Sequence, residues 1–402
     1  MNNNYNLDLS IISKELRLLL EILSAENNLN RVSSENELFT DIDWDEFLRL
    51  ARHHRVYPLI YSKIKNIDEA LIPLEIIQTF YQEYKTNTYQ MLQLSGEMGQ
   101  VSKLFSENQI RLLFLKGPVI AADIYGDISL RNSKDLDILI PITDLKKAEE
   151  ILLNNGYERE GISAFDDWKW MKHHVSYFHP LKKVHIEIHW RLHPPPAKEP
   201  KFSELWKRKR VSTIASYPIY FLGKEDLVLY LMAHGARHGW FRLRWLVDID
   251  QIIRKGTVLE NNNLLTKYHL QHHFFRQALI LTSQLLDTPI NKEMQKFTTG
   301  KHSKKSAQMA ILYIVEMGYL HINHNNVVGE PNSNSLMLNL QESFMNRYLF
   351  SMKSNLQKLI FVVQLFYPSS DDAMTLKLPK PFRFLYFPLR PFLWIWRKTR
   401  KS

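Results

Sequence analysis

Two acidic residues alternate with apolar ones in residues 134–140, which read KDLDILI. Such alternation predicts a β-strand on which Asp135 and Asp137 share one face while the apolar side chains occupy the other. Neighbouring carboxylates repel each other and are costly to bury unless a cation joins them. Mg²⁺ or Mn²⁺ suits such a pair, because water and a substrate phosphate complete the coordination shell. A D-x-D pair alone is equally consistent with solvated acids at the edge of a sheet.

A third acid lies in residues 184–190, whose sequence VHIEIHW also alternates. On a strand, His185, Glu187 and His189 share one face and the apolar side chains lie behind them. A polar face on a strand that is so apolar on its other side indicates the wall of a cleft. The alternative is an antiparallel strand whose polar face meets solvent.

Lys116 and Gly117 follow a short apolar segment and precede a helical one, so they form a strand-to-helix turn. Glycine allows close approach to the backbone, and the start of the next helix presents free N–H groups to an anion. Arg131 lies just before the acidic strand, where it could reach a phosphate oxygen. An ordinary turn and a surface arginine are the alternatives at these positions.

In order, the K-G turn, the helix, the R-x₃-D-x-D strand and the h-E-h-H-W strand resemble the nucleotidyltransferase superfamily. This superfamily includes DNA polymerase beta and the aminoglycoside nucleotidyltransferases. The chain is most similar to its bacterial branch of uncharacterised nucleotidyltransferases, with a general layout that extends over roughly 110–255. The segments that carry the resemblance are 115–140, 185–190 and 233–250, the last reading AHGARHGWFRLRWLVDID.

The resemblance implies a role for each candidate residue. Asp135 and Asp137 would bind two divalent cations, Mg²⁺ or Mn²⁺, and Glu187 would hold the metal that activates the acceptor hydroxyl. The reaction would move an NMP group from an NTP, with ATP preferred, to an unidentified acceptor by in-line transfer. That acceptor could be a small molecule, a glycan, a protein side chain or an RNA end. The groups expected near the triphosphate are Lys116, Gly117 and Arg131.

The chain departs from the superfamily at two positions. Pro118 follows Gly117 where the superfamily usually has serine, so a hydroxyl contact to phosphate is missing. Glu187 stands where aspartate is commoner, which moves the carboxylate outward. An alternative function from another class is therefore kept: a catalytically silent binding protein, or a membrane-associated assembly protein of polysaccharide biosynthesis or export.

Histidines on a predicted helix are further candidates. His234 and His238 are spaced i, i+4, but no glutamate follows His234, which argues against a zinc protease. Together with His185 and His189, they are expected to line the cleft or to pack against the core.

Other acids and histidines carry weaker signals. His173, His174 and His179 have no convincing spacing for a metal site. Asp248 and Asp250 form a second D-x-D, but on a helix their side chains diverge by about 200°. A joint metal site is therefore not expected at either set.

The elements around these residues predict an α+β fold, with a small mixed-sheet nucleotidyltransferase core between N-terminal and C-terminal helical segments. The expected divisions are 1–108, 109–222, 223–350 and 351–402. Strands are predicted at 110–115, 134–140, 174–178, 184–190, 211–215 and 219–222. Helices are predicted at 7–24, 44–54, 73–108, 119–124, 144–154, 227–237, 243–254, 271–286 and 306–320, with a loop at 323–334.

The formal net charge of the 402 residues is +10, but eight basic residues and no acidic one fall within 375–402. The rest of the chain is close to neutral, so binding to duplex DNA is not expected. The same tail is rich in aromatic residues and has four prolines, which are expected to prevent a long regular helix. It could pack on the body, attach to a membrane surface or stack on single-stranded nucleic acid.

Cysteine is absent, which excludes disulfides, thiol catalysis and zinc sites with cysteine ligands. The N-terminus lacks the basic and apolar regions of a signal peptide. No run of about 18 apolar residues predicts a transmembrane helix. A cytoplasmic location is expected, either free or at the inner face of the membrane.

Overall fold

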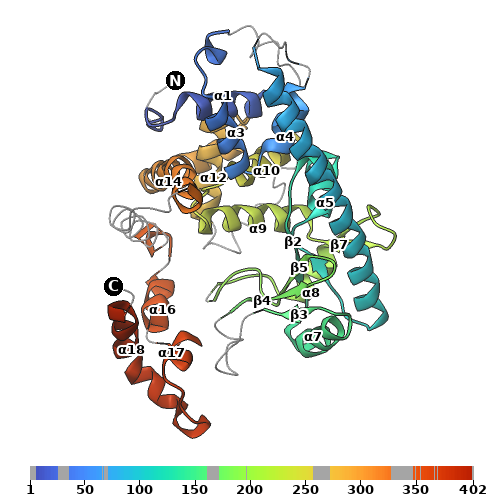
Figure 1. Ribbon diagram of the computed structural model, residues 1–402, viewed down its shortest axis with the longest axis vertical. Coiled ribbons are helices and arrows are strands. Elements are labelled where there is room, and N and C mark those ends of the chain that lie inside the picture. The colour runs from blue at the N-terminus through green and yellow to red at the C-terminus, as the bar shows by residue number, and fades with distance from the viewer. Residues whose placement is uncertain are drawn as a thin grey trace.

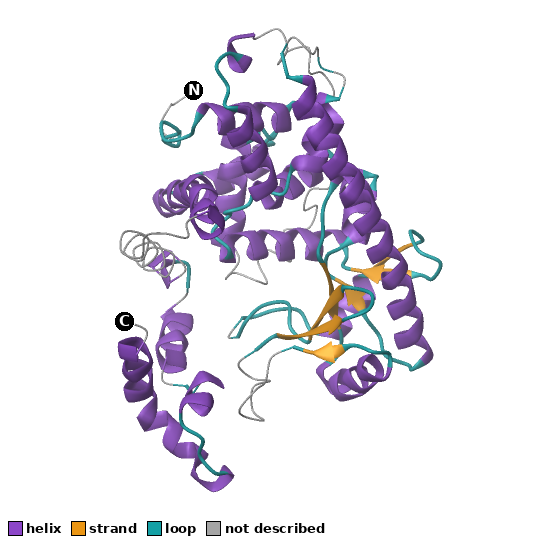
Figure 2. Ribbon diagram, in the orientation of Figure 1, coloured by secondary structure: helices purple, strands orange, loops and turns teal. Residues whose placement is uncertain are grey.

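The computed structural model describes residues 6–400 apart from 26–35, 66, 68–70, 161–171, 196, 257–271, 327–346, 349, 354, 366 and 369. Helical segments precede and follow one seven-stranded mixed sheet (Figure 1 and Figure 2). The predicted α+β fold, with a mixed-sheet core between helical segments, is confirmed. The predicted domain divisions stay predictions.

Strands β2 (Asp135–Leu139) and β5 (Val184–His189) are parallel neighbours near the middle of the sheet. Strand β1 (Leu113–Phe114) pairs with β2 antiparallel and with β7 (Ile219–Phe221) parallel, which makes the sheet mixed. The full order is β3-β4-β5-β2-β1-β7-β6, in which the remaining strands are β3 (Glu158–Arg159), β4 (His174–His179) and β6 (Arg210–Ser212).

Each central strand buries the apolar half of its alternating sequence. Leu136 and Ile138 on β2 are fully buried, as are Ile186 and Ile188 on β5. The long helix α5 (Leu74–Glu107) contacts β2 and β7 and runs beside the sheet in Figure 1. Because the apolar side chains of β2 and β5 are fixed in the core, the polar side chains of both strands must lie on the opposite face of the sheet.

The N-terminal helices begin where side chains cap them. The first predicted helix starts at Lys14, because the Ser13 hydroxyl accepts a hydrogen bond from the backbone N–H of Leu16 (3.2 Å). Asp43 caps the next predicted helix in the same way. The helices of this segment are α1 (Lys14–Ser24), α3 (Trp44–His53), α4 (Tyr57–Ile64) and α5.

Shorter helices connect the strands of the sheet, and longer ones follow it. Helix α14 runs to Asn326, so the loop predicted from residue 323 is wrong for its first four residues. Asparagine lowers helix propensity but does not stop a helix as proline does. The rest of that predicted loop lies outside the described residues. The helices are α6 (Pro118–Tyr125), α7 (Leu145–Asn154), α8 (Phe202–Arg208), α9 (Lys224–Arg237), α10 (Leu243–Arg254), α12 (His272–Leu285), α13 (Lys292–Thr298) and α14 (Lys301–Asn326).

The tail forms helices α16 (Asn355–Leu365), α17 (Ser370–Thr375) and α18 (Tyr386–Arg400). The expectation that prolines prevent a long helix here is wrong, because α18 continues through Pro391. Pro388 lies in the first turn, where the backbone N–H has no partner within the helix in any case. Asp372 on α17 accepts hydrogen bonds from Arg390 (2.7 Å) and Arg397 (2.6 Å), and these bonds hold the helix along its length.

In the described part of the chain, no helix is long and apolar enough to cross a membrane.

Candidate active site

The turn between β1 and α6 brings a lysine to the acidic strand. Gly117 has φ +95°, and a Cβ at this position would lie 3.2 Å from Met98 and 3.4 Å from Leu136, so both conformation and space favour glycine. Lys116, the preceding residue, donates a hydrogen bond from Nζ to Asp137 Oδ1 (3.0 Å). Lys116 thus contacts Asp137 directly.

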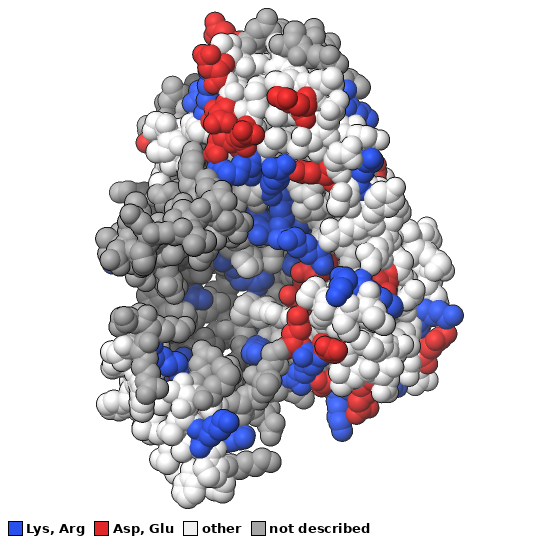
Figure 3. Space-filling model, in the orientation of Figure 1, with Lys and Arg blue, Asp and Glu red and all other residues white. Residues whose placement is uncertain are grey.

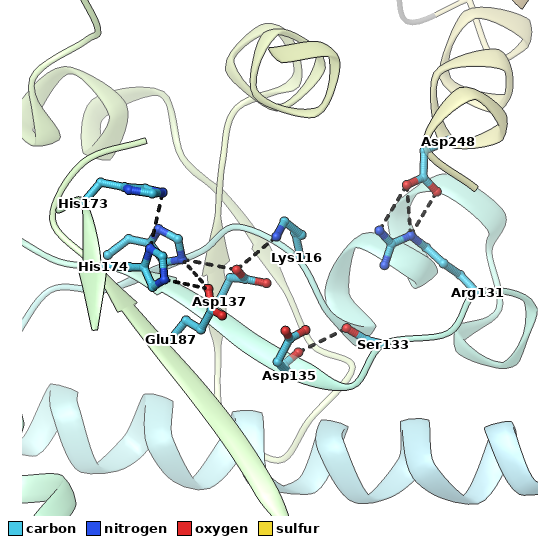
Figure 4. A network of polar contacts seen from close by, with 10 residues as sticks. Lys116, Arg131, Ser133, Asp135, Asp137, His173, His174, Glu187 and Asp248 are labelled. Carbon is cyan, nitrogen blue, oxygen red and sulfur yellow. Dashed lines mark hydrogen bonds and ion pairs between the residues drawn. The ribbon is translucent and has the colours of Figure 1, made fainter. Parts of the chain in front are cut away.

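The parallel register of β2 and β5 sets Asp137 directly opposite Glu187 and Asp135 opposite His185. His189 lies one step further along the same face of β5. Its Nε2 is 3.2 Å from Asp137 Oδ1 and 3.3 Å from Glu187 Oε2. Figure 4 shows Asp137 and Glu187 side by side on the two strands, with Lys116 directed at Asp137. One ligand atom from each of Asp137, Glu187 and His189 falls within 4.8 Å of the others, a group that can hold a metal ion.

Asp137 is the electrostatic centre of this group, with an exposed fraction of 0%. Burial would raise its pKa, but Lys116 and the His189 hydrogen bond hold the pKa of this carboxyl well below its usual range. Its second oxygen, Oδ2, is buried and has no hydrogen-bond partner among the described residues. A charged oxygen in that situation fits a cation ligand.

Asp135 lies at the start of β2 on the same face, but it is not part of the three-residue group. Burial raises its pKa, and the nearby charge of Asp137 adds to the shift. In Figure 4, Asp135 lies between the carboxylates and Ser133, whose hydroxyl donates to the Asp135 carbonyl oxygen (3.1 Å). The three predicted acids therefore share one face of the sheet. Asp137 and Glu187 both contact His189, whereas Asp135 lies at the start of the strand.

Three basic side chains, Arg55, Lys134 and Arg242, interact electrostatically with Asp135, and we call them the basic cluster. Arg55 lowers the pKa of Lys134, and burial together with Arg55 lowers the pKa of Arg242 to about 10. The pKa of Arg55 is also lowered, by burial. Asp135 raises the pKa of all three side chains, so it is the acid that interacts with each of them. None of the three has an ion-pair partner within the part of the chain that the structure describes. Figure 3 shows Lys and Arg side chains gathered between the helical half and the sheet.

Contacts between distant segments assemble the basic cluster. Backbone N–H groups at the start of α10 donate to His54: Arg244 to its carbonyl oxygen and Leu243 to its Nδ1, both at 3.3 Å. Arg244 also donates from Nη1 to Asn132 Oδ1 (2.8 Å), which ties α10 to the segment before β2. Sequence reasoning missed Arg55, because no local pattern indicates a contact between the N-terminal helices and β2.

Arg131, which was expected to reach a phosphate, lies in the interior instead. Its side chain is 1% exposed and forms a two-pronged ion pair with Asp248, with Nε–Oδ1 at 2.9 Å and Nη2–Oδ2 at 3.1 Å. Tyr125 donates a further hydrogen bond to Asp248 (2.8 Å). Figure 4 shows this pair apart from the carboxylate group. We therefore reassign Arg131 from phosphate binding to holding α10 on the core.

The remaining predicted residues have structural neighbours of their own. Asp250 pairs with Arg254 (2.7 Å), away from the Asp248 pair, so the two acids diverge as expected. His185 lies 3.4 Å from Glu160 and is half-exposed. His234 and His238 pack together and against Trp245, with ring centroids 4.6 to 5.4 Å apart. Burial lowers the pKa of both, that of His238 to about 4.

A mixed sheet with two acids on one strand, a third on its parallel neighbour and a basic strand-to-helix turn is a nucleotidyltransferase-type core. A family model described as uncharacterised nucleotidyltransferase matches residues 40–287, more than half of the chain. The chain belongs to this family, which implies nucleotidyl transfer and a nucleotide substrate. The match is longer than the layout predicted over 110–255 and includes the segment that carries Arg55. A comparison with curated proteins and another with solved structures gave no match.

Proposed function

We propose that the protein transfers an NMP group from an NTP, ATP first, to a hydroxyl of an acceptor, with Mg²⁺ or Mn²⁺ at the carboxylates. The observation that supports this most is the convergence of Asp137, Glu187 and His189 around a buried carboxylate oxygen without a described partner. Two carboxylates with open coordination positions suit hard divalent ions that also bind phosphate oxygens.

The acids and the lysine of the site then have different roles. Asp135, Asp137 and Glu187 would hold the cations, which neutralise the triphosphate and activate the acceptor hydroxyl. Lys116 stays beside Asp137 and adds positive charge where the transferred phosphate develops negative charge. Glu187 is more exposed than Asp137, at 27% against 0% for the side chains, so we assign it the acceptor's proton.

The basic cluster would bind the triphosphate. Arg55, Lys134 and Arg242 repel one another, so an anion between them relieves that repulsion. Arginine recognises phosphate through paired N–H donors, and the cluster lies next to Asp135. This role replaces the one first expected of Arg131.

Arg55→Gln and Arg242→Gln are each expected to weaken NTP binding about tenfold, or about 1.4 kcal/mol, because each removes a charge-assisted contact to phosphate. The measurement is thermal stabilisation of the protein by each of the four NTPs in the presence of Mg²⁺. ATP is expected to stabilise the wild-type protein most.

Arg52→Gln is the matched control, because Arg52 lies three residues from Arg55 and pairs with Glu83 at the surface. It should leave NTP stabilisation unchanged. Equal NTP affinity in Arg55→Gln, Arg242→Gln and wild type would contradict the triphosphate role. No stabilisation of the wild type by any NTP would instead favour the alternative function, a silent binding or assembly protein.

A second proposal concerns the tail, which we infer contacts an anionic membrane surface. On α18, Tyr386 and Leu393 are buried, whereas Phe392, Trp394 and Trp396 are each at least half-exposed. Arg390 and Arg397 turn inward to Asp372, so the outer face is predominantly aromatic. Exposed aromatic side chains suit the interface of a bilayer, and Lys377, exposed in the segment before α18, adds positive charge that favours an anionic one.

Phe392→Ser combined with Trp396→Ser is expected to reduce binding to vesicles of phosphatidylcholine and phosphatidylglycerol at least about tenfold, because two exposed rings no longer enter the interface. Co-sedimentation with these vesicles measures the binding, with pure phosphatidylcholine as the comparison. Val211→Ser, an exposed apolar residue on the sheet, is the control and should change nothing. Failure of the wild-type protein to bind anionic vesicles would refute this proposal.

A further inference from the structure

A second group of possible metal ligands adjoins the carboxylates. One ring nitrogen from each of His173, His174 and His189 falls within 4.8 Å of the others. Their sequence spacing gave no sign of this, because β4 and β5 bring the residues together. His174 lies directly opposite His189 in the antiparallel register, with ring centroids 5.0 Å apart. His173 precedes the strand, and its ring centroid is 5.6 Å from that of His189.

Two of these ring nitrogens, on His173 and His174, have the spacing of ligands to one ion. His173 Nε2 and His174 Nδ1 are 3.3 Å apart. Zinc–nitrogen bonds of about 2.0–2.1 Å place two ligand nitrogens roughly 3.4 Å apart in a tetrahedral site. Closing the group around one ion therefore needs shifts on the order of an ångström for the third ring.

An unpartnered atom on a buried side chain points to a ligand independently. His189 is 4% exposed, and its Nε2 contacts Asp137 and Glu187. Its other nitrogen, Nδ1, is buried and has no hydrogen-bond partner in the residues described. Buried ring nitrogens are normally satisfied, so this atom calls for a partner that the described residues do not supply.

We propose that His173, His174 and His189 bind one transition-metal ion, of the zinc or cobalt type, next to the carboxylate site. Imidazole ligands favour zinc, cobalt and similar ions, whereas Mg²⁺ favours oxygen ligands. Three imidazoles leave a fourth position open, as in zinc sites that bind water or substrate. The site shares His189 with the carboxylate group, but His173 and His174 belong to it alone.

His189 would connect this ion to the carboxylates. With Nδ1 on the ion, Nε2 carries the proton and donates toward Asp137 and Glu187. The ion would thereby fix the orientation of the imidazole that touches both acids. His189 is a positioning residue in this arrangement.

The test uses Co²⁺ and Zn²⁺ alone, added to the full-length protein without nucleotide. Wild type is expected to bind one Co²⁺ with a visible absorption band typical of nitrogen ligands, and one Zn²⁺ by calorimetry. His173→Asn and His174→Asn should each weaken binding by about 10- to 100-fold or more. His185→Asn, on the same face of β5, is the matched control and should bind as wild type does.

Asp137→Asn separates this site from the carboxylates. It removes one carboxylate but none of the three imidazoles, so the variant should retain the Co²⁺ band. Loss of the band in Asp137→Asn with retention in His173→Asn would place the ion at the carboxylates and overturn the proposal. Absence of any band or calorimetric signal in the wild type would also overturn it. Circular dichroism of each variant shows that it is folded. NTP stabilisation in Mg²⁺, measured on wild type, His173→Asn and His174→Asn, reports separately on the proposed function.

Discussion

Asp137→Asn is expected to lower the rate of nucleotidyl transfer by about 10³-fold, because it removes the buried negative charge around which the site is arranged. Asparagine keeps the size of the side chain but loses the charge that faces Lys116 and His189. It also leaves the unpartnered Oδ2 position without the charge that would bind a cation. Release of pyrophosphate from ATP in Mg²⁺, with a range of hydroxyl acceptors, measures the effect.

Stability must be separated from catalysis in this variant. Asp137→Asn leaves the Lys116 ammonium without its buried counter-ion, which costs on the order of 3–5 kcal/mol of unfolding free energy. The double variant Asp137→Asn/Lys116→Met removes both charges and should recover most of the stability without recovering the activity. Asp123→Asn, whose carboxylate pairs with Arg210 on the same core (2.6 Å), is the matched control. Wild-type rates in Asp137→Asn would exclude this acid from the reaction.

Asp248→Asn is expected to lower the unfolding free energy by about 3–5 kcal/mol while leaving NTP affinity near that of wild type. The reason is that Arg131, 1% exposed, would lose the carboxylate that neutralises it inside the protein. Urea denaturation measures the stability, and NTP stabilisation of the folded protein measures the affinity. Glu46→Gln, at the more exposed pair with Arg49, should change stability by less than about 1 kcal/mol.

A charge-free replacement of this pair tests the reassignment of Arg131. Arg131→Met/Asp248→Leu should be more stable than either single variant, because no unpaired charge stays buried. The opposite pattern for Arg131→Met alone, wild-type stability with much weaker NTP binding, would return Arg131 to the phosphate site. Arg131→Met thus distinguishes the two roles: a structural role predicts lower stability, and a phosphate-binding role predicts weaker NTP binding.

The strands and most helices could be predicted because their sequences have clear periods. Alternation in KDLDILI and VHIEIHW identified β2 and β5 and the face that carries the acids. The helix boundaries at Lys14 and Asn326, and the continuation of α18 through Pro391, could not be predicted in the same way. The start at Lys14 depends on the Ser13 cap, and the end at Asn326 on asparagines that do not stop the helix. The continuation through Pro391 depends on the ion pairs with Asp372. Hydrophobic periodicity reports none of these.

The site could be predicted only as far as single strands allow. That Asp137 lies opposite Glu187 depends on the parallel register of strands far apart in sequence. The family resemblance implied that these acids act together, but neither it nor the residues alone predicted the register. Arg131 was misassigned because its partner, Asp248, follows 117 residues later. Arg55, His173 and His174 were missed for the same reason: tertiary contacts place them beside the acids.

Lys116 has one more consequence for how the protein behaves in a cell. Burial alone would lower the pKa of Lys116, but Asp137 and neighbouring groups raise it, so Lys116 stays protonated beside the acids. The chain therefore supplies one of the positive charges that neutralise Asp137, whereas in a zinc finger an external ion supplies that charge. With the metal role proposed above, we expect scarcity of divalent ions to slow turnover and to leave this ion pair in place.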